Sequence, residues 1–290
     1  MSDKPHVDEI SGVETTGHEW DGIRELNNPL PRWWVWIFYA TIVFSIGYAI
    51  YYPSIPLLND FTKGVGGYSS RAELNQELDA AAAAKAGLLA RLAETDVTEI
   101  PSDPELMRFA VSGGAAAYRV NCSQCHGSGA QGGFGYPNLN DDAWLWGGDL
   151  QSLYTTIAHG IRFETDDQTR YSEMPAFGRD GILDRQQIKA LALYVRSLAG
   201  LDDGWVDAGE TEQSFLDNCA ACHGEDGKGM AMMGAPNLTD AIWLYGSETD
   251  QIIRQISEPR HGVMPAWGDR LGDVTVKQLT LYVHQLGGGE

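Results

Sequence analysis

The sequence has 290 residues, with 20 Lys and Arg against 40 Asp and Glu, and a formal net charge of −20. Its hydrophobic share of 43% excludes a chain that is disordered throughout, and its acidity argues against nucleic-acid binding, which needs basic side chains at the phosphates. Four cysteines are too few for a disulfide-stapled protein of this length, and the acidity suits a partner with a basic surface.

The first predicted element is a membrane-spanning helix at residues 33–52. These twenty residues carry no charge, and as a helix they would span about 30 Å, the hydrocarbon thickness of a bilayer. The alternatives are a buried core helix and a cleaved signal peptide. Residues 1–32 are mostly polar and acidic, and no small-residue cleavage motif follows the run, so the pattern favours an uncleaved anchor. Nearby basic residues balance on its two sides, and charge alone therefore does not orient it.

A linker is predicted at residues 53–104. Residues 53–70 have the Pro and Gly content of a juxtamembrane loop, and residues 71–94 are rich in Ala, Leu, Glu, Lys and Arg, which are strong helix formers. Another helix is expected to start near Asp103 and Pro104, a capping residue followed by Pro in the first turn.

The rest of the chain repeats itself, which predicts two copies of one domain at residues 105–200 and 205–290. Five blocks recur in the same order, namely 122–126 and 219–223, 137–139 and 236–238, 143–147 and 242–246, 174–178 and 264–268, and 193–195 and 281–283. Closing helices are predicted at 184–198 and 273–286, the first with an apolar face made by Ile188, Leu191, Ala192, Val195 and Leu198. No alternating strand pattern of useful length appears, so the expected fold class is all-α with long loops.

The block that begins each copy's chemistry is Cys-x-x-Cys-His, the attachment sequence of c-type haem. Its two thiols would form thioethers with the porphyrin, and the imidazole that follows would bind the iron. A zinc ribbon would need the Cys pairs about 15–20 residues apart, and a thioredoxin-like motif would need a βαβ context. A disulfide within each motif would not explain the adjoining His in both copies. The sequence therefore predicts two covalent haem c groups, held by Cys122, Cys125, His126, Cys219, Cys222 and His223.

A sixth iron ligand is expected from Met174 and Met264, which follow His126 and His223 by 48 and 41 residues. Each lies in a Met-Pro-Ala-aromatic-Gly segment, and a thioether ligand raises the reduction potential. His159 and His261 are weaker candidates.

Other methionines fit the sixth position less well. Met230, Met232 and Met233 lie too near His223 in sequence, and Met107 has no counterpart in copy two.

Several neighbouring residues are expected around the haem groups. The carbonyls of Pro137 and Pro236 are placed to accept the ring N–H of the two motif histidines, which would orient the imidazoles. Trp144, Trp243, Tyr136 and Arg162 are candidates either for contacts with haem propionates or for plain packing.

Residues 20–34 (WDGIRELNNPLPRWW), the single membrane helix, the Ala-rich region and the two haem-c domains together resemble the di-haem subunit of cbb3-type cytochrome c oxidases, called CcoP or FixP. The resemblance covers essentially the whole chain. It implies two tandem class I cytochrome c folds, with His126 paired with Met174 and His223 paired with Met264. It also implies electron transfer from a donor cytochrome into a catalytic core that reduces oxygen and pumps protons, with the catalytic and mono-haem oxidase subunits as partners. The longer 162–173 insert of copy one leaves the Met174 loop less well matched.

The sequence by itself supports an electron relay rather than an oxygen-reducing enzyme, because none of its seven histidines lies in the membrane helix. Haem c is assembled outside the bacterial inner membrane, so the haem domains are expected in the periplasm and residues 1–32 in the cytoplasm. The alternatives are a freestanding membrane-anchored di-haem shuttle, a di-haem peroxidase with one open iron position, and a haem-based gas sensor with a signalling domain.

Overall fold

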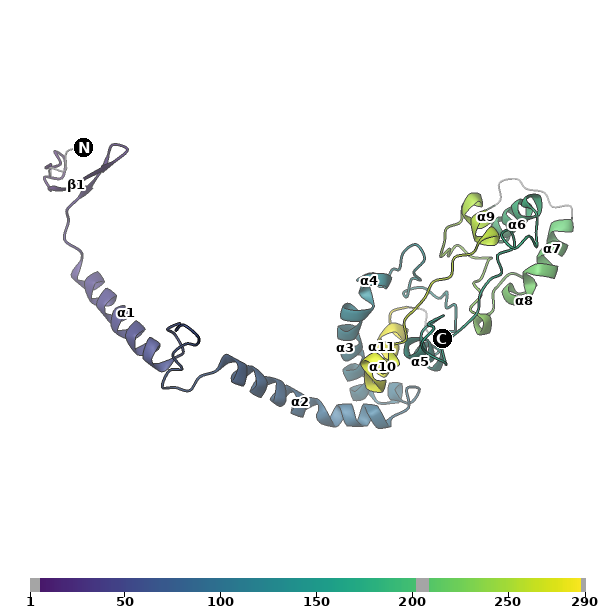
Figure 1. The fold of residues 1–290 in the computed structure, drawn as a ribbon, viewed down its shortest axis with the longest axis horizontal. Coiled ribbons are helices and arrows are strands. Elements are labelled where there is room, and N and C mark those ends of the chain that lie inside the picture. The colour runs from purple at the N-terminus through teal and green to yellow at the C-terminus, as the bar shows by residue number, and fades with distance from the viewer. Residues whose placement is uncertain (1–5, 202–208, 288–290) are drawn as a thin grey trace. The chain divides into compact units, whose positions relative to one another are not determined.

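The computed structural model describes residues 6–201 and 209–287 (Figure 1). These residues are mostly helical, which confirms the predicted fold class, with one two-stranded sheet near the N-terminus. The chain forms two compact units that divide between Ala83 and Ala84, inside a long helix.

The first unit begins with a hairpin that the sequence analysis missed. β1 (Thr15–Trp20) pairs antiparallel with β2 (Ile23–Leu26), and Trp20 lies opposite Ile23. The two residues between the strands, Asp21 and Gly22, have φ angles of 48° and 81°. Positive φ at both positions is what a tight two-residue hairpin turn requires, and Asp-Gly is a preferred sequence for it.

The helix predicted at residues 33–52 is α1 (Arg32–Tyr51), shifted by one residue at each end. None of its side chains is buried, and by length and composition it is the one helix of the described residues that could cross a membrane. Pro31 precedes its first turn, where the missing N–H leaves no helical hydrogen bond unmade.

The predicted Ala-rich helix is α2 (Ser70–Glu94), whose last residues belong to the second unit. Leu92 is fully buried, in a small apolar cluster with Ile100 and Leu106. Lys277, far along the chain, donates from Nζ to the carbonyls of Leu92 and Ala93 at 3.3 and 3.0 Å. A lysine at this position satisfies carbonyls that the end of a helix leaves unpaired, so it holds the end of α2 to the second unit.

The second unit contains the helices of both copies. η1 (Ile100–Ser102) lies just before copy one, which has α3 (Pro104–Asn121), α4 (Ser123–His126), α5 (Leu150–His159) and α6 (Arg185–Leu198). Copy two has α7 (Glu210–Asn218), α8 (Ala220–His223), η2 (Ala231–Met233), α9 (Thr249–Ser257), α10 (Gly268–Leu271) and α11 (Asp273–His284). The start of α3 is confirmed, because the Asp103 carboxylate accepts from the N–H groups of Glu105 and Leu106.

The closing helices of the two copies are exchanged. α11, from the end of copy two, packs on α3 and α5 of copy one, while α6, from the end of copy one, packs on α7 and α9 of copy two (Figure 1). Gly114 makes the first of these contacts possible, because a Cβ atom there would collide with the carbonyl of Gln278 in α11. Each copy therefore needs the other to complete its interior.

Two apolar cores result, and each draws residues from both copies. Core 1 comprises Tyr118, Ala130, Leu153, Ile157, Ala158, Trp267, Val276, Leu279 and Val283. Core 2 comprises Phe177, Leu183, Ile188, Leu191, Ala192, Val195, Phe215, Ile252 and Ile256. The predicted apolar face of α6 is confirmed, and it is buried in core 2 against helices of copy two.

Candidate haem-binding sites

Each Cys-x-x-Cys-His segment forms the same local structure. α4 and α8 are single helical turns that follow directly on the longer helices α3 and α7. The N–H groups of the second cysteine and of the histidine donate to the carbonyl of the first cysteine, at 3.1 and 3.0 Å in both copies. A glycine with positive φ, Gly127 or Gly224, ends each turn. The two thiols and the imidazole are therefore presented by the same backbone geometry twice.

Each motif histidine is oriented through Nδ1. His126 Nδ1 lies 3.1 Å from the Pro137 carbonyl, and His223 Nδ1 lies 3.1 Å from the Pro236 carbonyl. Because a carbonyl only accepts, Nδ1 carries the proton and Nε2 is left with a free lone pair. Burial lowers the pKa of both imidazoles and outweighs the bonds to the carbonyls, which alone would raise it. The lowered pKa favours the neutral ring that a metal binds. The contact predicted for the two prolines is confirmed.

Matched glycines let the proline loops approach the histidines. The N–H groups of Gly132 and Gly229 donate to the carbonyls of His126 and His223 at 2.8 and 2.7 Å. Both glycines have positive φ, and a Cβ atom at either would lie 2.5–2.7 Å from the backbone of the proline loop. Only glycine therefore fits the position that keeps the proline carbonyl at the imidazole.

The two methionines lie at the cores, but each lies with the other copy's cysteines. Met264 and Cys122 both pack against core 1, whereas Met174 and Cys219 both pack against core 2. This grouping differs from the pairing implied by the family resemblance, His126 with Met174 and His223 with Met264. Met264 thus shares core 1 with the first cysteine of the motif that contains His126, and Met174 shares core 2 with the first cysteine of the motif that contains His223.

Backbone hydrogen bonds fix this crossed arrangement. The Ile161 N–H donates to the Met264 carbonyl at 2.9 Å, and the Met264 N–H donates to the Ile161 carbonyl at 3.0 Å. In the segment that follows Met174, the N–H groups of Gly178 and Arg179 donate to the carbonyl of Ser257, in copy two, at 3.2 and 3.0 Å. Each methionine segment thus bonds to the backbone at the end of a helix from the opposite copy, α5 for Met264 and α9 for Met174. This follows because each segment directly precedes the closing helix that is exchanged.

The donor set fits a covalent haem c at each site. All four cysteines are free thiols, and burial raises the pKa of Cys122 and Cys219 to about 11, which keeps them protonated and unlike reactive thiolates. The Trp243 Nε1 atom is buried next to core 2 with no hydrogen-bond partner among the described residues. A buried indole N–H without an acceptor fits a site that is completed by an acceptor such as a haem propionate.

The two other histidine candidates have different contacts. His159 Nδ1 lies 3.1 Å from the Asp166 carboxylate, in the insert that only copy one carries. His261 Nε2 accepts the N–H of Met174 at 3.0 Å, so His261 touches the backbone of a candidate ligand. Sequence reasoning missed this role, although the position of His261 three residues before Met264 pointed to the methionine loops.

The remaining methionines of the described residues are not among those that pack on either core. Met232 is 82% exposed, and it lies with Met230 and Met233 around the short η2 turn. Met107 packs on the apolar cluster around Leu92.

Basic residues of the copy-one insert bind backbone atoms. Arg162 Nε donates to the Gly262 carbonyl at 2.8 Å, and Arg170 Nη2 donates to the Ser152 carbonyl at 3.1 Å. The Arg170 side chain also lies over the Trp146 ring, 5.4 Å from its centre. Arg170 was not singled out from the sequence, because the insert has no equivalent in copy two against which to compare it.

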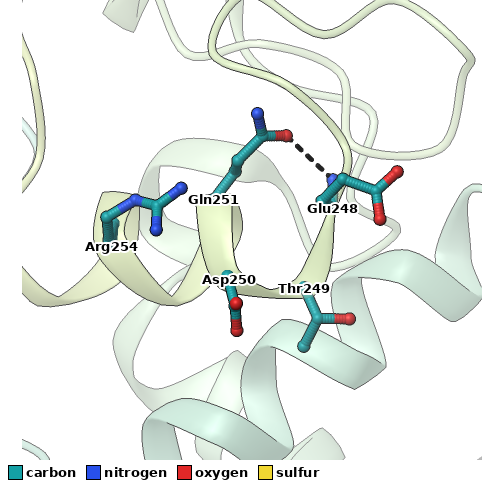
Figure 2. Close-up of a pocket in the computed structure, with 5 residues that line it drawn as sticks. All are labelled: Glu248, Thr249, Asp250, Gln251 and Arg254. Carbon is teal, nitrogen blue, oxygen red and sulfur yellow. Dashed lines mark hydrogen bonds between the residues drawn. The ribbon is translucent and has the colours of Figure 1, made fainter.

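Figure 2 shows a shallow hollow at the start of α9, lined by Glu248, Thr249, Asp250, Gln251 and Arg254. Its lining contains no cysteine, histidine or methionine. The Gln251 side chain reaches back to the Glu248 N–H at 3.1 Å, which is half of a capping box. The hollow therefore belongs to the helix start that places Ile252 and Ile256 in core 2.

Three family models match three successive parts of the chain. Residues 12–59 match the N-terminal domain of cytochrome oxidase-cbb3, FixP. Residues 111–199 match cytochrome c, and residues 207–283 match cytochrome c oxidase, cbb3-type, subunit III.

Similar proteins match over their full length. The chain is 61% identical over 291 residues to the cbb3-type cytochrome c oxidase subunit FixPc of Rhizobium leguminosarum bv. viciae. It is 60% identical over 291 residues to FixP of Sinorhizobium medicae, and 52% identical over 290 residues to the subunit CcoP of Cereibacter sphaeroides. In all three comparisons the alignment covers 100% of this chain and 100% of the relative.

Proposed function

The chain belongs to the FixP/CcoP family of cbb3-type cytochrome c oxidase subunits, and on this premise we propose that it relays electrons through two covalent haem c groups. When bound, a haem c supplies an iron that takes up and returns one electron. Cys122 and Cys125 would hold one group and Cys219 and Cys222 the other. The observation that carries the proposal is that each motif histidine has Nδ1 on a proline carbonyl, at a core that also holds a methionine.

The chain's residues would hold the iron at each site through one imidazole and one thioether. His126 and Met264 are the proposed pair at core 1, and His223 and Met174 the pair at core 2. The proline carbonyls hold the imidazoles in the tautomer that leaves Nε2 free. Apolar side chains of both cores exclude water from the sites, which together with a thioether ligand favours the reduced state. Binding of both residues would leave oxygen or peroxide no access to the iron, so we propose that this subunit is not catalytic by itself.

The location follows from the same chemistry. We propose that α1 anchors the chain in the bacterial inner membrane, with the second unit in the periplasm and the N-terminal hairpin in the cytoplasm. Electrons would enter from a donor cytochrome and leave to the catalytic and mono-haem subunits of the oxidase. The relatives' names as oxidase subunits support this assembly.

The proposal is tested by purifying the chain from membranes in mild detergent. We expect haem to stay with the chain on denaturing electrophoresis, two haems per chain, co-purification of a haem-copper subunit, and rapid reduction by a reduced donor cytochrome. Loss of all haem on denaturation would contradict covalent attachment. Stoichiometric carbon monoxide binding by the unmodified protein would contradict saturated irons and favour a peroxidase, whereas purification without an oxidase would favour a freestanding shuttle.

A further inference from the structure

The segments that lead to the two candidate sixth ligands meet at one arginine. Arg162 Nε donates to the Gly262 carbonyl at 2.8 Å, and its Nη1 donates to the Ser172 carbonyl at 2.9 Å. Gly262 lies two residues before Met264, and Ser172 lies two residues before Met174. One guanidinium thus holds both methionine segments at equivalent positions, through a planar fork that fixes the direction of each bond.

The backbone around Arg162 joins the same segments. The neighbouring Ile161 exchanges two backbone hydrogen bonds with Met264, and the Arg162 N–H donates to the Arg170 carbonyl at 2.8 Å. Arg162 itself has a φ of 52°, which is uncommon for a residue with a side chain and persists only where surrounding contacts require it. The backbone conformation is therefore consistent with a residue held at a junction.

A second contact crosses the junction in the opposite direction. His261, three residues before Met264, accepts the N–H of Met174 on its Nε2 at 3.0 Å. The His261 side chain holds the Met174 N–H, while the His261 backbone lies in the segment that leads to Met264. Removing the Arg162 side chain would therefore release both methionine segments. Removing the His261 side chain would release only the Met174 N–H.

Arg162 holds the two segments through the geometry of its hydrogen bonds and not through its charge. The hydrogen bonds from Arg162 to Gly262 and Ser172 go to neutral carbonyls, while Glu173 acts on the guanidinium only through space. A lysine would keep the charge, but a single ammonium on a flexible stem cannot reproduce two bonds in a fixed fork. Geometry and charge can therefore be separated by substitution.

We propose that Arg162 is a positioning residue shared by both haem sites, which holds the Met174 and Met264 segments at their irons together. The inference rests on the proposed haem ligation. It goes beyond that ligation by making the sixth ligand at one site depend on the same side chain as the sixth ligand at the other. Arg162 was considered above for a propionate contact, whereas its bonds to Gly262 and Ser172 assign it this different role.

The test compares five full-length proteins purified in mild detergent: the unmodified chain, Arg162→Gln, Arg162→Lys, His261→Ala and Arg260→Gln. Arg260 is the matched control, because it lies two residues before Gly262, is exposed, and contacts the Phe134 ring 5.5 Å away. Haem content is measured first, then the methionine–iron charge-transfer band, and then carbon monoxide bound per chain. These are spectroscopic readouts that do not depend on oxidase activity.

We expect Arg162→Gln to weaken the methionine–iron band at both sites and to bind carbon monoxide toward two equivalents per chain. His261→Ala should bind toward one equivalent, and the control should match the unmodified chain. Arg162→Lys should behave as Arg162→Gln does, and it carries the test if the glutamine variant fails to assemble. Rescue by lysine, or an effect of Arg162→Gln at one site or at none, would overturn the proposal. An unmodified chain without covalent haem or with open irons would instead overturn the proposed function.

Discussion

Met264 lies in register with Ile161 of the other copy, and the two residues exchange both backbone hydrogen bonds. Ile161 follows α5, which carries core 1 residues of copy one, whereas Met264 precedes α10 and α11 of copy two. This pairing makes the two copies one folding unit, since neither core is complete without residues of both. Family membership explains why the chain has two cytochrome c segments, and the exchange explains why they form one compact body.

The exchange depends on the close crossing of α3 and α11. We expect Gly114→Val to destabilise the chain by about 1–3 kcal/mol, because the new side chain would overlap the Gln278 carbonyl. Gly87→Ala is the matched control, since Gly87 also lies in a helix and has open space around its Cβ position. It should be neutral or stabilising by up to about 1 kcal/mol. Denaturant unfolding of the detergent-solubilised chain measures both, and equal stability of the two variants would argue against the crossing.

The close approach of Gly229 to the Pro236 loop should be needed for haem loading. Gly229→Ala places a Cβ atom 2.5 Å from the Ala235 carbonyl oxygen, which displaces the loop that orients His223. We expect covalent haem to fall from two per chain toward one, as measured by the haem-to-protein ratio. Gly272→Ala is the control that separates crowding from backbone strain. Gly272 also has a positive φ, 76°, but its Cβ position has no atom within 4 Å. That control should keep both haems, and an equal loss in both variants would contradict the expectation.

Sequence patterns predicted the helices better than they predicted which methionine packs on which core. The α6 face and the start of α3 followed from periodicity and capping, which are local properties. The carbonyls of Pro137 and Pro236 followed from comparing the two copies. The crossed methionines did not, because the two Met-Pro segments are nearly alike, and either copy's segment satisfies the same local requirements.

The hairpin near the N-terminus was missed for a different reason. Its strands are mostly exposed and mixed in polarity, so the alternation that marks a half-buried strand is absent. The informative feature was the Asp21-Gly22 dipeptide, whose two positive φ angles set the turn.

An acidic transition is expected at the contact between α11 and α5. Tyr154 donates to Asp273 at 2.6 Å, and Lys277 lies 2.9 Å from the same carboxylate. Burial alone would raise the pKa of Asp273, but the bonds from Tyr154 and Lys277 outweigh it and lower that pKa. Burial, then the bond to Asp273, raises the pKa of Tyr154 to about 12, so its hydroxyl remains a donor.

A carboxylate with a lowered pKa in the folded state stabilises the fold above its unfolded pKa of about 3.9 and loses this contribution as the pH falls through the folded value. Asp273→Asn should therefore reduce stability by roughly 1 kcal/mol at pH 7, a modest figure because the carboxylate is half exposed. The difference should shrink below about pH 4. Unfolding curves across this range measure it, with the exposed Asp269→Asn as control. A difference that is constant with pH would contradict the assignment.

The central claim is that each iron takes its methionine from the opposite copy. It is tested in a chain with Cys122→Ser and Cys125→Ser, which leaves only the haem on Cys219 and Cys222. In this background Met174→Ala should abolish the methionine–iron charge-transfer band and open the iron to carbon monoxide, while Met264→Ala should leave the band intact. The reverse result, with the band lost in Met264→Ala and kept in Met174→Ala, would contradict the crossed ligation.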